Sequence, residues 1–457
     1  MGPPDTPRKD GMAHHSERTD RFRYDAFDID SERGQLTCRY SVGEHRFTER
    51  ITIDVPGDWS APSVLAAARL VFLLGGVSYY KTAAPSVIDL GSLGTTADER
   101  AFLLSFYQQG LAEFALRNGL DLSGLRIVGP AAEPSPPAAF SPGAGRPLVP
   151  FGGGIDSIVT VESVRDRFDD PALFVVSREG DAFPAIERPA ALAGLPVLRA
   201  RREIDPRVLR STELGFLNGH VPVTGVISAV AVLAAVLDGR DAVVMSNEWS
   251  ASVGTLTPDG RAVNHQYSKS LAFELGFRKL VHHSLGTALR YFSLLRPYSE
   301  LWVARRFADL PRYHRAFRSC NRSFHLDPAM RLDDWCGVCD KCCFIDLILS
   351  PFLPAGELAT IFGGREPLAE PTLAGRFRTL IGTSGGSKPF ECVGDVGECR
   401  TAVLMAADRA DRASTPLLAA LVAEIRAGGG APTVGDLLGP LGDHCIPHEY
   451  APEDQLV

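Results

Sequence analysis

Three consecutive glycines stand between an apolar stretch and an amphipathic one in the segment LVPFGGGIDSIVTVESV. Glycines let a backbone approach an anion closely, and a helix that begins directly after them presents unpaired N–H groups to it. Asp156 could hold Mg²⁺, and Ser157 could donate its hydroxyl to a phosphate oxygen. The alternative is an ordinary strand-to-helix turn with Asp156 as the helix cap. Because the turn follows an apolar run and opens a helix, we favour an anion site formed by Gly152, Gly153, Gly154, Asp156 and Ser157.

A second chemical pattern is a cluster of cysteines. The chain has nine cysteines, and Cys336, Cys339 and Cys342 are separated by two-residue gaps, with Cys320 upstream. Four thiolates form a closed tetrahedral zinc site, and two-residue gaps let neighbouring sulfurs reach one ion. Free structural cysteines are the alternative. We expect a structural Zn²⁺ rather than a catalytic one, and we expect Cys343 to point away into packing.

These residues need a scaffold, and the segment after residue 146 has the pattern of an α/β fold. Short apolar runs such as RPLVPF, ALFVVS and DAVVMSNE alternate with helical stretches, including a long apolar one at 222–238. Such alternation predicts a parallel sheet covered by helices, with ligands bound at the carboxyl ends of the strands. The segment SNEWS follows one strand and places Asn247 and Glu248 at that edge, although an exposed turn is the alternative.

The segments before and after this core have other patterns. Polar and apolar residues alternate from residue 22 to about 54, which predicts antiparallel strands, and two helical stretches follow at 61–81 and 97–119. A Pro-, Ala- and Gly-rich stretch then predicts a linker. The expected organisation is a disordered tail at 1–21, an α+β N-terminal domain at 22–128, a linker at 129–146, a core with the cysteine site at 147–345, and a mostly helical C-terminal region at 346–457.

Composition excludes several classes of protein. The chain has 457 residues, 45% hydrophobic and 22% charged, with a formal net charge of −8. This is a globular composition, and the acidic balance argues against a nucleic-acid partner. The longest apolar candidate for a membrane span, VISAVAVLAAVLDG, has the length of a core helix, so no membrane association is expected. The N-terminus lacks the apolar core of a secretory signal, which favours a cytoplasmic location.

The glycine segment resembles the pyrophosphatase loop, Ser-Gly-Gly-x-Asp-Ser, of the PP-loop enzymes that cleave ATP to AMP and pyrophosphate. The match covers Gly153, Gly154, Asp156 and Ser157, whereas Gly152 replaces the first serine, which removes a hydroxyl but keeps the amide. It has neither the Gly-Lys-Ser/Thr ending of a Walker A loop nor a dinucleotide fingerprint. The resemblance implies a parallel-sheet, adenine nucleotide alpha-hydrolase-like core.

In that superfamily the next strand lies beside the adenine, which here implicates Val176 and Ser177. The loop together with the cysteine spacing is similar to 7-cyano-7-deazaguanine synthase, a zinc-containing member. Four other stretches do not fit that synthase: VMSNEWSASVGT (244–255), VNHQYSKS (263–270), CGVCDKCCFIDLILSPFL (336–353) and SKPFECVGDVGECR (387–400). With the loop and the N-terminal domain, they resemble the ATP-dependent UDP-N-acetylmuramoyl-L-alanyl-L-glutamate epimerases over most of the chain.

This second resemblance implies inversion of the terminal L-Glu of UDP-MurNAc-L-Ala-L-Glu to D-Glu, which supplies a peptidoglycan precursor. ATP would convert the glutamate carboxylate into an acyl-adenylate, a better electron sink, and Mg²⁺ (or Mn²⁺) would neutralise the departing pyrophosphate. The alternatives are an AMP-forming ligase or synthase like the deazaguanine enzyme, and a nucleotide- or RNA-binding module without turnover.

Inversion requires proton delivery on the opposite face of the α-carbon, so one movable base or two positioned groups are expected. The segment KPFECVG offers Lys388, Glu391 and Cys392, and NGHVPVTG offers His220. Their alternatives are a solvated Lys–Glu pair, an ordinary buried cysteine and a capping or core histidine. In HQYSKS, the side chains of His265, Tyr267 and Lys269 could contact phosphate or carboxylate groups, with capping and surface roles left open.

Overall fold

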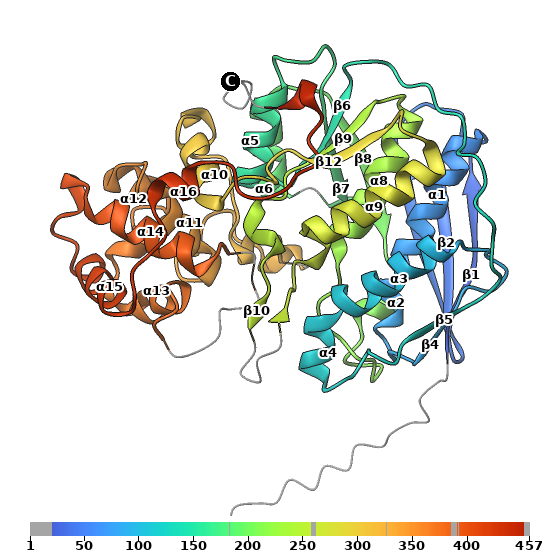
Figure 1. The fold of residues 1–457 in the computed structure, drawn as a ribbon, viewed down its shortest axis with the longest axis horizontal. Coiled ribbons are helices and arrows are strands. Elements are labelled where there is room, and N and C mark those ends of the chain that lie inside the picture. The colour runs from blue at the N-terminus through green and yellow to red at the C-terminus, as the bar shows by residue number, and fades with distance from the viewer. Residues whose placement is uncertain are drawn as a thin grey trace, which may run out of the picture.

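The computed structural model describes residues 21–451 except 182, 257–261, 326, 385–390 and 392, so nearly all of the expected N-terminal tail lies outside it. Ten strands form one sheet (Figure 1), in the spatial order β12 (Arg290–Ser293), β9 (Ala242–Met245), β6 (Pro147–Pro150), β7 (Ala172–Ser177), β8 (Val197–Glu203), β3 (His45–Ile53), β2 (Gln35–Val42), β1 (Phe22–Asp30), β4 (Val87–Asp89) and β5 (Arg126–Val128). Strands β10 (Thr255–Leu256) and β11 (Ala262–Val263) form a separate hairpin.

The half of the sheet from β12 to β8 is parallel. In chain order, β6, β7 and β8 run to one side, and β9 and β12 are added on the other. This is a doubly wound arrangement, in which the direction of winding reverses between β6 and β9. The α/β fold expected from the sequence is therefore confirmed.

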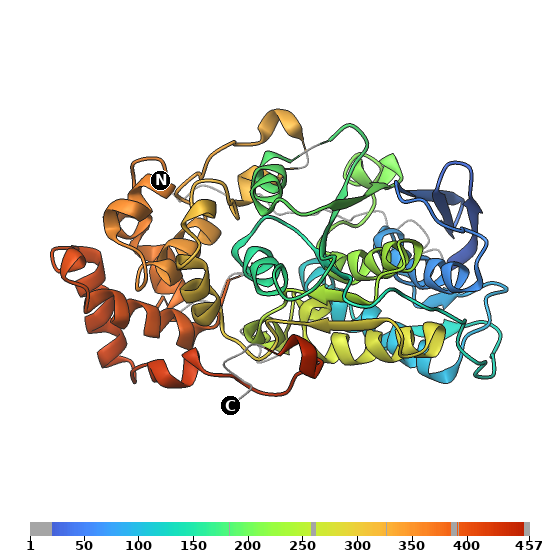
Figure 2. The same cartoon turned by 90° about the horizontal axis from the view of Figure 1, so that it is seen from above.

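Successive side chains of these strands point into two different cores, as the pleat of a strand requires. Leu148 and Phe174 belong to the core with α1 (Pro62–Gly75), α8 (Val223–Leu237) and α9 (Leu271–Leu285). Val149 and Val175 belong to the core with α5 (Ile155–Val164), α6 (Pro184–Ala193) and α10 (Glu300–Ala308). Helices therefore cover both faces of the sheet (Figure 2).

The helix expected at 222–238 forms as α8, and it is apolar all round because it is packed between the sheet and α1. The stretch expected as one helix at 61–81 is divided into α1 and α2 (Val77–Tyr80), and that at 97–119 into α3 (Ala97–Gly110) and α4 (Ala112–Asn118). The helical stretch 62–80 is long and apolar enough to cross a membrane, but 83% of its most apolar window is buried, as in a core helix.

The antiparallel strands β1, β2 and β3 continue the parallel sheet, because β3 pairs antiparallel with β8 from Arg50–Glu203 to Ile53–Ala200. The segments 22–128 and 147–345, expected as two domains, thus contribute strands to one sheet. The connection between them, 129–146, has no strand or helix of its own.

The C-terminal region is helical in its described part, as expected, and lies at the opposite end of the molecule from β1 and β2 (Figures 1 and 2). Its helices are α11 (Asp340–Leu349), α12 (Ala355–Ile361), α13 (Ala374–Leu380), α14 (Val396–Ala407), α15 (Pro416–Ala427) and α16 (Val434–Leu438). Through α11, α14 and α16 it packs on α10. A further short helix, α7 (Pro206–Leu209), follows β8.

A buried ion pair joins the two halves of the sheet. Arg202 on β8 donates to both carboxylate oxygens of Glu49 on β3, at 2.7 and 3.3 Å, and to Ser78 Oγ at 3.1 Å. The Glu49 side chain is 1% exposed. An unpaired carboxylate at this position would be costly because water cannot replace the arginine.

We expect Arg202→Met to lower the free energy of unfolding by about 3–5 kcal/mol, because it leaves the Glu49 carboxylate buried without its cation. The matched control is Arg39→Met, which removes an exposed pair with Asp28 on the neighbouring strands and should cost about 0–1 kcal/mol. Chemical denaturation of both variants measures the difference. Equal effects would contradict the role assigned to the buried pair.

Candidate active site and metal site

A cleft of about 650 Å³ opens at the carboxyl ends of β6, β7 and β9. Its floor includes Gly152 after β6, Val176 at the end of β7, and Ser246 and Asn247 after β9. This is the point at which the winding reverses, where the connections after two neighbouring strands leave toward opposite faces of the sheet. Sheets of this type bind ligands there, so the cleft is the candidate active site.

The three glycines have different structural roles. Gly153 has φ +75°, and a Cβ atom on it would lie 2.2 Å from the carbonyl oxygen of Ala185. Gly154 is the N-cap of α5. A Cβ atom on Gly152 would meet nothing within 4 Å, although Gly152 lines the cleft. Gly153 is therefore required by the turn and its packing on α6, whereas Gly152 leaves space open for a ligand.

Asp156 and Ser157 lie in the first turn of α5 and line the cleft. The Ser157 hydroxyl donates to the carbonyl oxygen of Gly154 at 3.1 Å. An N-terminal turn of a helix, with its orphan N–H groups, thus faces the open space left by Gly152. This arrangement suits an anion.

Two walls rise from this floor, and they come from opposite faces of the sheet. Thr224 and Ile227 of α8 form the first wall with His220, His265 and Lys269; α8 belongs to the core on that face. The second wall carries Arg318, Ser319, Asn321, Phe324, Lys341 and Glu391. This wall belongs to the second face of the sheet, because the core on that face includes Cys320, beside Ser319 and Asn321, and Phe344, on the same helix as Lys341.

Most of the residues expected at the site are brought together. The cleft is lined by Gly152, Gly154, Asp156, Ser157, Val176, His220, Asn247 and Glu391. Gly153, Ser177 and Glu248 are not among its lining residues. Lys388 and Cys392 lie outside the described residues.

Sequence reasoning missed Arg318, Ser319, Asn321 and Lys341 on the second wall. Asn321 donates to Glu391 at 2.6 Å and so holds that carboxylate at the cleft. The side chain of Arg318 is held by loop groups, donating to the carbonyl oxygen of Asp333 at 3.1 Å and to the Asp334 carboxylate at 2.9 Å. The signal for these residues was their position beside Cys320, Cys339 and Cys342 in the chain.

Glu248 belongs to a group of buried carboxyl groups rather than to the cleft surface. It accepts a hydrogen bond from Ser250 Oγ at 3.1 Å and is 3% exposed. Burial raises the pKa of Glu300 well above its ordinary value, and the neighbouring Asp156 and Glu248 raise it further. Burial also raises the pKa of Glu398 to about 8. Both buried carboxyl groups therefore hold a proton more readily than exposed carboxyl groups do.

The two histidines of the first wall are neighbours. The ring centroids of His220 and His265 are 6.1 Å apart, with the planes at 73°. Burial lowers the pKa of His220 below its ordinary value; Glu113 opposes this effect, whereas His265 and Lys269 add to it. The His220 ring is therefore mainly neutral at pH 7 and able to accept a proton.

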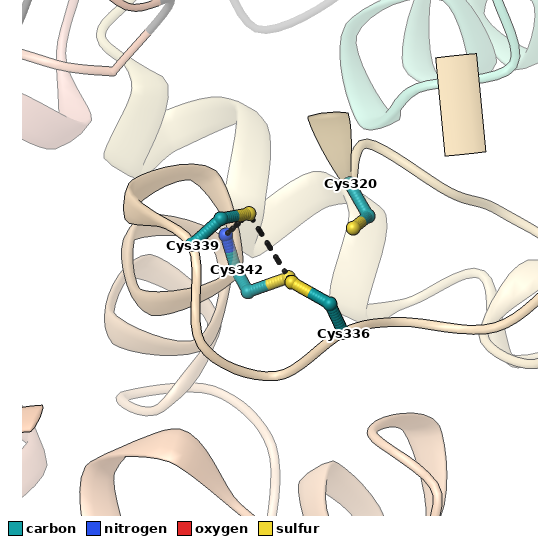
Figure 3. A group of neighbouring side chains, drawn as sticks. All are labelled: Cys320, Cys336, Cys339 and Cys342. Atoms are coloured by element: carbon teal, nitrogen blue, oxygen red, sulfur yellow. Dashed lines mark hydrogen bonds between the residues drawn. The ribbon is translucent and has the colours of Figure 1, made fainter. Parts of the chain in front are cut away.

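The four expected cysteine ligands come together in one place (Figure 3), and their sulfur atoms all lie within 4.8 Å of one another. The Sγ atom of Cys342 is 3.4 Å from that of Cys339 and 3.7 Å from that of Cys336. A tetrahedron with Zn–S bonds of about 2.3 Å has S–S edges of about 3.8 Å. The donor set therefore fits a structural metal ion such as zinc.

A metal ion at this site would also fix the second wall of the cleft. Cys320 precedes the short helix η4 (Asn321–Phe324), and Cys339 caps the N-terminus of α11. A shared ion would join these two elements, which carry Asn321 and Lys341 to the cleft. Cys343 is buried in the core and is not part of the cysteine group, as expected.

The fold and site define a doubly wound α/β protein with a glycine turn at its reversal point and, beside it, four cysteines that could hold a metal ion. The chain matches the MurL N-terminal domain over residues 13–294 and the MurL C-terminal domain over residues 316–432. It therefore belongs to the MurL family.

Several relatives cover most of the chain, and each is named UDP-N-acetyl-alpha-D-muramoyl-L-alanyl-L-glutamate epimerase. The protein of Xanthomonas oryzae pv. oryzae is 42% identical over 85% of this chain and 86% of its own length. That of Salinispora tropica is 40% identical over 89% of both chains. That of a Micromonospora species is 38% identical over 95% of this chain and 97% of its own. Membership of this family makes the chain an isomerase-type enzyme.

We expect Gly152→Ala and Gly153→Ala to fail in different ways. Gly153→Ala should destabilise the protein because the new methyl group meets backbone and φ is positive. Gly152→Ala should keep the melting temperature within about 2 °C but weaken ATP binding at least tenfold, because its methyl group enters the space left for a phosphate. Calorimetric melting and ATP titration measure both. Unchanged ATP affinity in a folded Gly152→Ala protein would contradict this role of the loop.

Removing a cysteine ligand should release the metal ion. We expect Cys342→Ser to lose bound zinc, measured by elemental analysis, and to lower the melting temperature by roughly 10 °C, because the ion holds η4 against α11. Cys445→Ser is the matched control, since this half-buried cysteine is not part of the cysteine group. Stoichiometric zinc retained by Cys342→Ser would show that the four-sulfur site is not the metal site.

Proposed function

We propose that this chain inverts the terminal L-Glu of UDP-MurNAc-L-Ala-L-Glu to D-Glu and cleaves ATP to AMP and pyrophosphate in doing so. The observation that carries the proposal is the glycine turn and helix N-terminus at the floor of a two-walled cleft, in a chain whose relatives are named as epimerases of this dipeptide. The core would then be a PP-loop domain. The reaction would take place in the cytoplasm and supply peptidoglycan synthesis.

The chemistry explains why such an epimerase would consume ATP. The α-proton of a carboxylate is hard to remove, because the resulting carbanion adds negative charge to a group that already carries one. Attack of the carboxylate oxygen on the α-phosphorus of ATP forms an acyl-adenylate and expels pyrophosphate. The acyl carbonyl can then accept the electron pair of the broken C–H bond. After reprotonation, water attacks the acyl carbon and releases AMP.

The floor of the cleft would bind the nucleotide. The amides of Gly152 and Gly154 would bind the phosphates, together with the hydroxyl of Ser157 once it turns from the Gly154 carbonyl, and Val176 at the end of the next strand would contact the adenine. Asp156 lines the same space and would hold Mg²⁺ or Mn²⁺, whose charge would favour departure of pyrophosphate. Asn247 is presented to the cleft by its backbone, which exchanges hydrogen bonds with Ser293 Oγ at 2.6 and 2.7 Å.

The walls would bind the dipeptide and move its proton. Lys269 and Lys341 supply positive charge on opposite walls, which suits a substrate with carboxylates and a diphosphate. His220 and Glu391 are the described candidates for proton transfer. Lys388 and Cys392 remain candidates because they flank Glu391 in the sequence.

The proposal is tested by incubating the protein with UDP-MurNAc-L-Ala-L-Glu, ATP and Mg²⁺ in D₂O. We expect AMP, pyrophosphate and product containing D-Glu with deuterium at its α-carbon, because the returned proton comes from groups that exchange with solvent. Chiral analysis after hydrolysis, nucleotide chromatography and mass spectrometry measure the three signals.

AMP without inversion or deuterium would instead indicate an adenylate-forming ligase lacking its acceptor, such as ammonia. Neither AMP nor inversion from folded, zinc-loaded protein would show that the substrate is wrong.

A further inference from the structure

Inversion at a carbon atom requires proton transfer on two opposite faces of that atom. The two walls of the cleft satisfy this requirement. Once the α-proton has left, the α-carbon is planar, and the returning proton must reach its other face. A group fixed on one wall would return the proton to the face it came from, so inversion without a movable base needs groups on both walls. The cleft has ionisable groups on both walls, and the walls belong to opposite faces of the sheet.

The first wall carries the imidazole rings of His220 and His265, which lie next to each other. His220 lies just before α8 and His265 just before η2 (Tyr267–Lys269), and α8 packs against η2. Besides the ring contact at 6.1 Å, His220 is hydrogen-bonded to the backbone of His265. The His265 residue is 8% exposed, so its ring is held in place by its surroundings.

The second wall carries Glu391, held by Asn321 at 2.6 Å. Glu391 lies in the segment that connects to α14, which packs on α10 and α11. The two histidines and Glu391 therefore lie on different walls. A substrate bound between the walls would have an imidazole on one side and a carboxyl group on the other.

We propose that the His220–His265 pair is the proton-transfer unit for one face of the substrate α-carbon, with His265 as its second member, and that the wall carrying Glu391 serves the opposite face. This inference rests on the proposed function. In the forward direction the pair removes the α-proton of the L-epimer: the C–H bond breaks, the proton moves to an imidazole nitrogen, and the electron pair moves into the acyl carbonyl. A proton from the opposite wall then forms the new C–H bond, and exchange with solvent restores both groups.

The groups around His220 favour its role as the proton acceptor. The groups that act on His220 are Glu113, His265 and Lys269, and Glu113 is itself paired with Arg117 at 2.6 Å. Burial is the largest influence and lowers the pKa of His220. The resting His220 ring is therefore mainly neutral near pH 7 and able to accept a proton.

The test separates the two faces by following hydrogen exchange from each epimer. With ATP and Mg²⁺ in D₂O, we expect His265→Asn and His220→Asn to form AMP from the L-epimer within about threefold of wild type. Deuterium incorporation into the L-epimer and formation of the D-epimer should fall by roughly 10²–10⁴-fold. Exchange at the α-carbon of the D-epimer should persist, because the opposite wall removes that proton.

Two controls make the result specific. Glu391→Gln should show the mirror image, with exchange of the L-epimer retained and exchange of the D-epimer lost. His282→Asn, which changes a partly exposed histidine outside the cleft, should leave all signals unchanged. In the wild type, the exchange rate of the L-epimer should hold as the pH falls through 6.5 and decline only at lower pH, since the pKa of His220 is lowered.

The inference is overturned if either histidine variant forms the D-epimer at the wild-type rate. It is also overturned if AMP formation is lost together with inversion in a protein with the wild-type melting temperature, because the pair would then act in binding or activation. A wild-type protein that forms neither AMP nor the D-epimer would be a failure of the proposed function itself, and the inference would fall with it.

Discussion

The reversal of winding between β6 and β9 is the constraint on which the site depends. Because the connections after these neighbouring parallel strands leave toward opposite faces of the sheet, the described part of the chain leaves a cleft at the strand ends between them. The turn after β6 forms part of the cleft floor, so backbone N–H groups as well as the side chains of Asp156 and Ser157 are available to a ligand there. Both walls are then supplied by elements from different faces, which gives one substrate two chemically different sides.

A metal ion shared by the four cysteines would make one of these walls more rigid than its local structure does. Part of this wall is a loop followed by the short 3₁₀ helix η4, which buries few apolar side chains compared with α8 on the other side. A shared metal ion would hold Cys320 against α11 and so set the positions of Asn321 and Lys341. A metal ion bound there would also help to position Glu391, because Asn321 donates a hydrogen bond to its carboxylate.

Local patterns were sufficient to predict the glycine turn, the cysteine group and the strands from 22 to 54. A strand periodicity or a two-residue cysteine gap is set by nearest neighbours in the chain. The pairing of β3 with β8 could not be predicted, since it joins residues far apart in sequence and depends on which sheet edge remains free. For the same reason, the sequence did not indicate that the segments 22–128 and 147–345 share one sheet.

The composition of the walls was also beyond sequence reasoning. His220, His265 and Glu391 are separated by long stretches, and only the packing of α8, η2 and α14 around the sheet brings them to one cleft. Glu248 shows the opposite case. It follows a strand, as Asn247 does, but its side chain points into a buried group of carboxyl groups, because successive residues leave an extended backbone on opposite sides.

The central claim is that the substrate carboxylate is activated at the α-phosphorus of ATP in this cleft. The most direct measurement uses substrate labelled with ¹⁸O in both oxygens of the glutamate α-carboxylate and follows the label by mass spectrometry of the AMP. The account predicts one ¹⁸O atom in the phosphate of each AMP, because the bridging oxygen of the acyl-adenylate stays with phosphorus when water attacks the acyl carbon. AMP without ¹⁸O, or ADP in place of AMP, would contradict it.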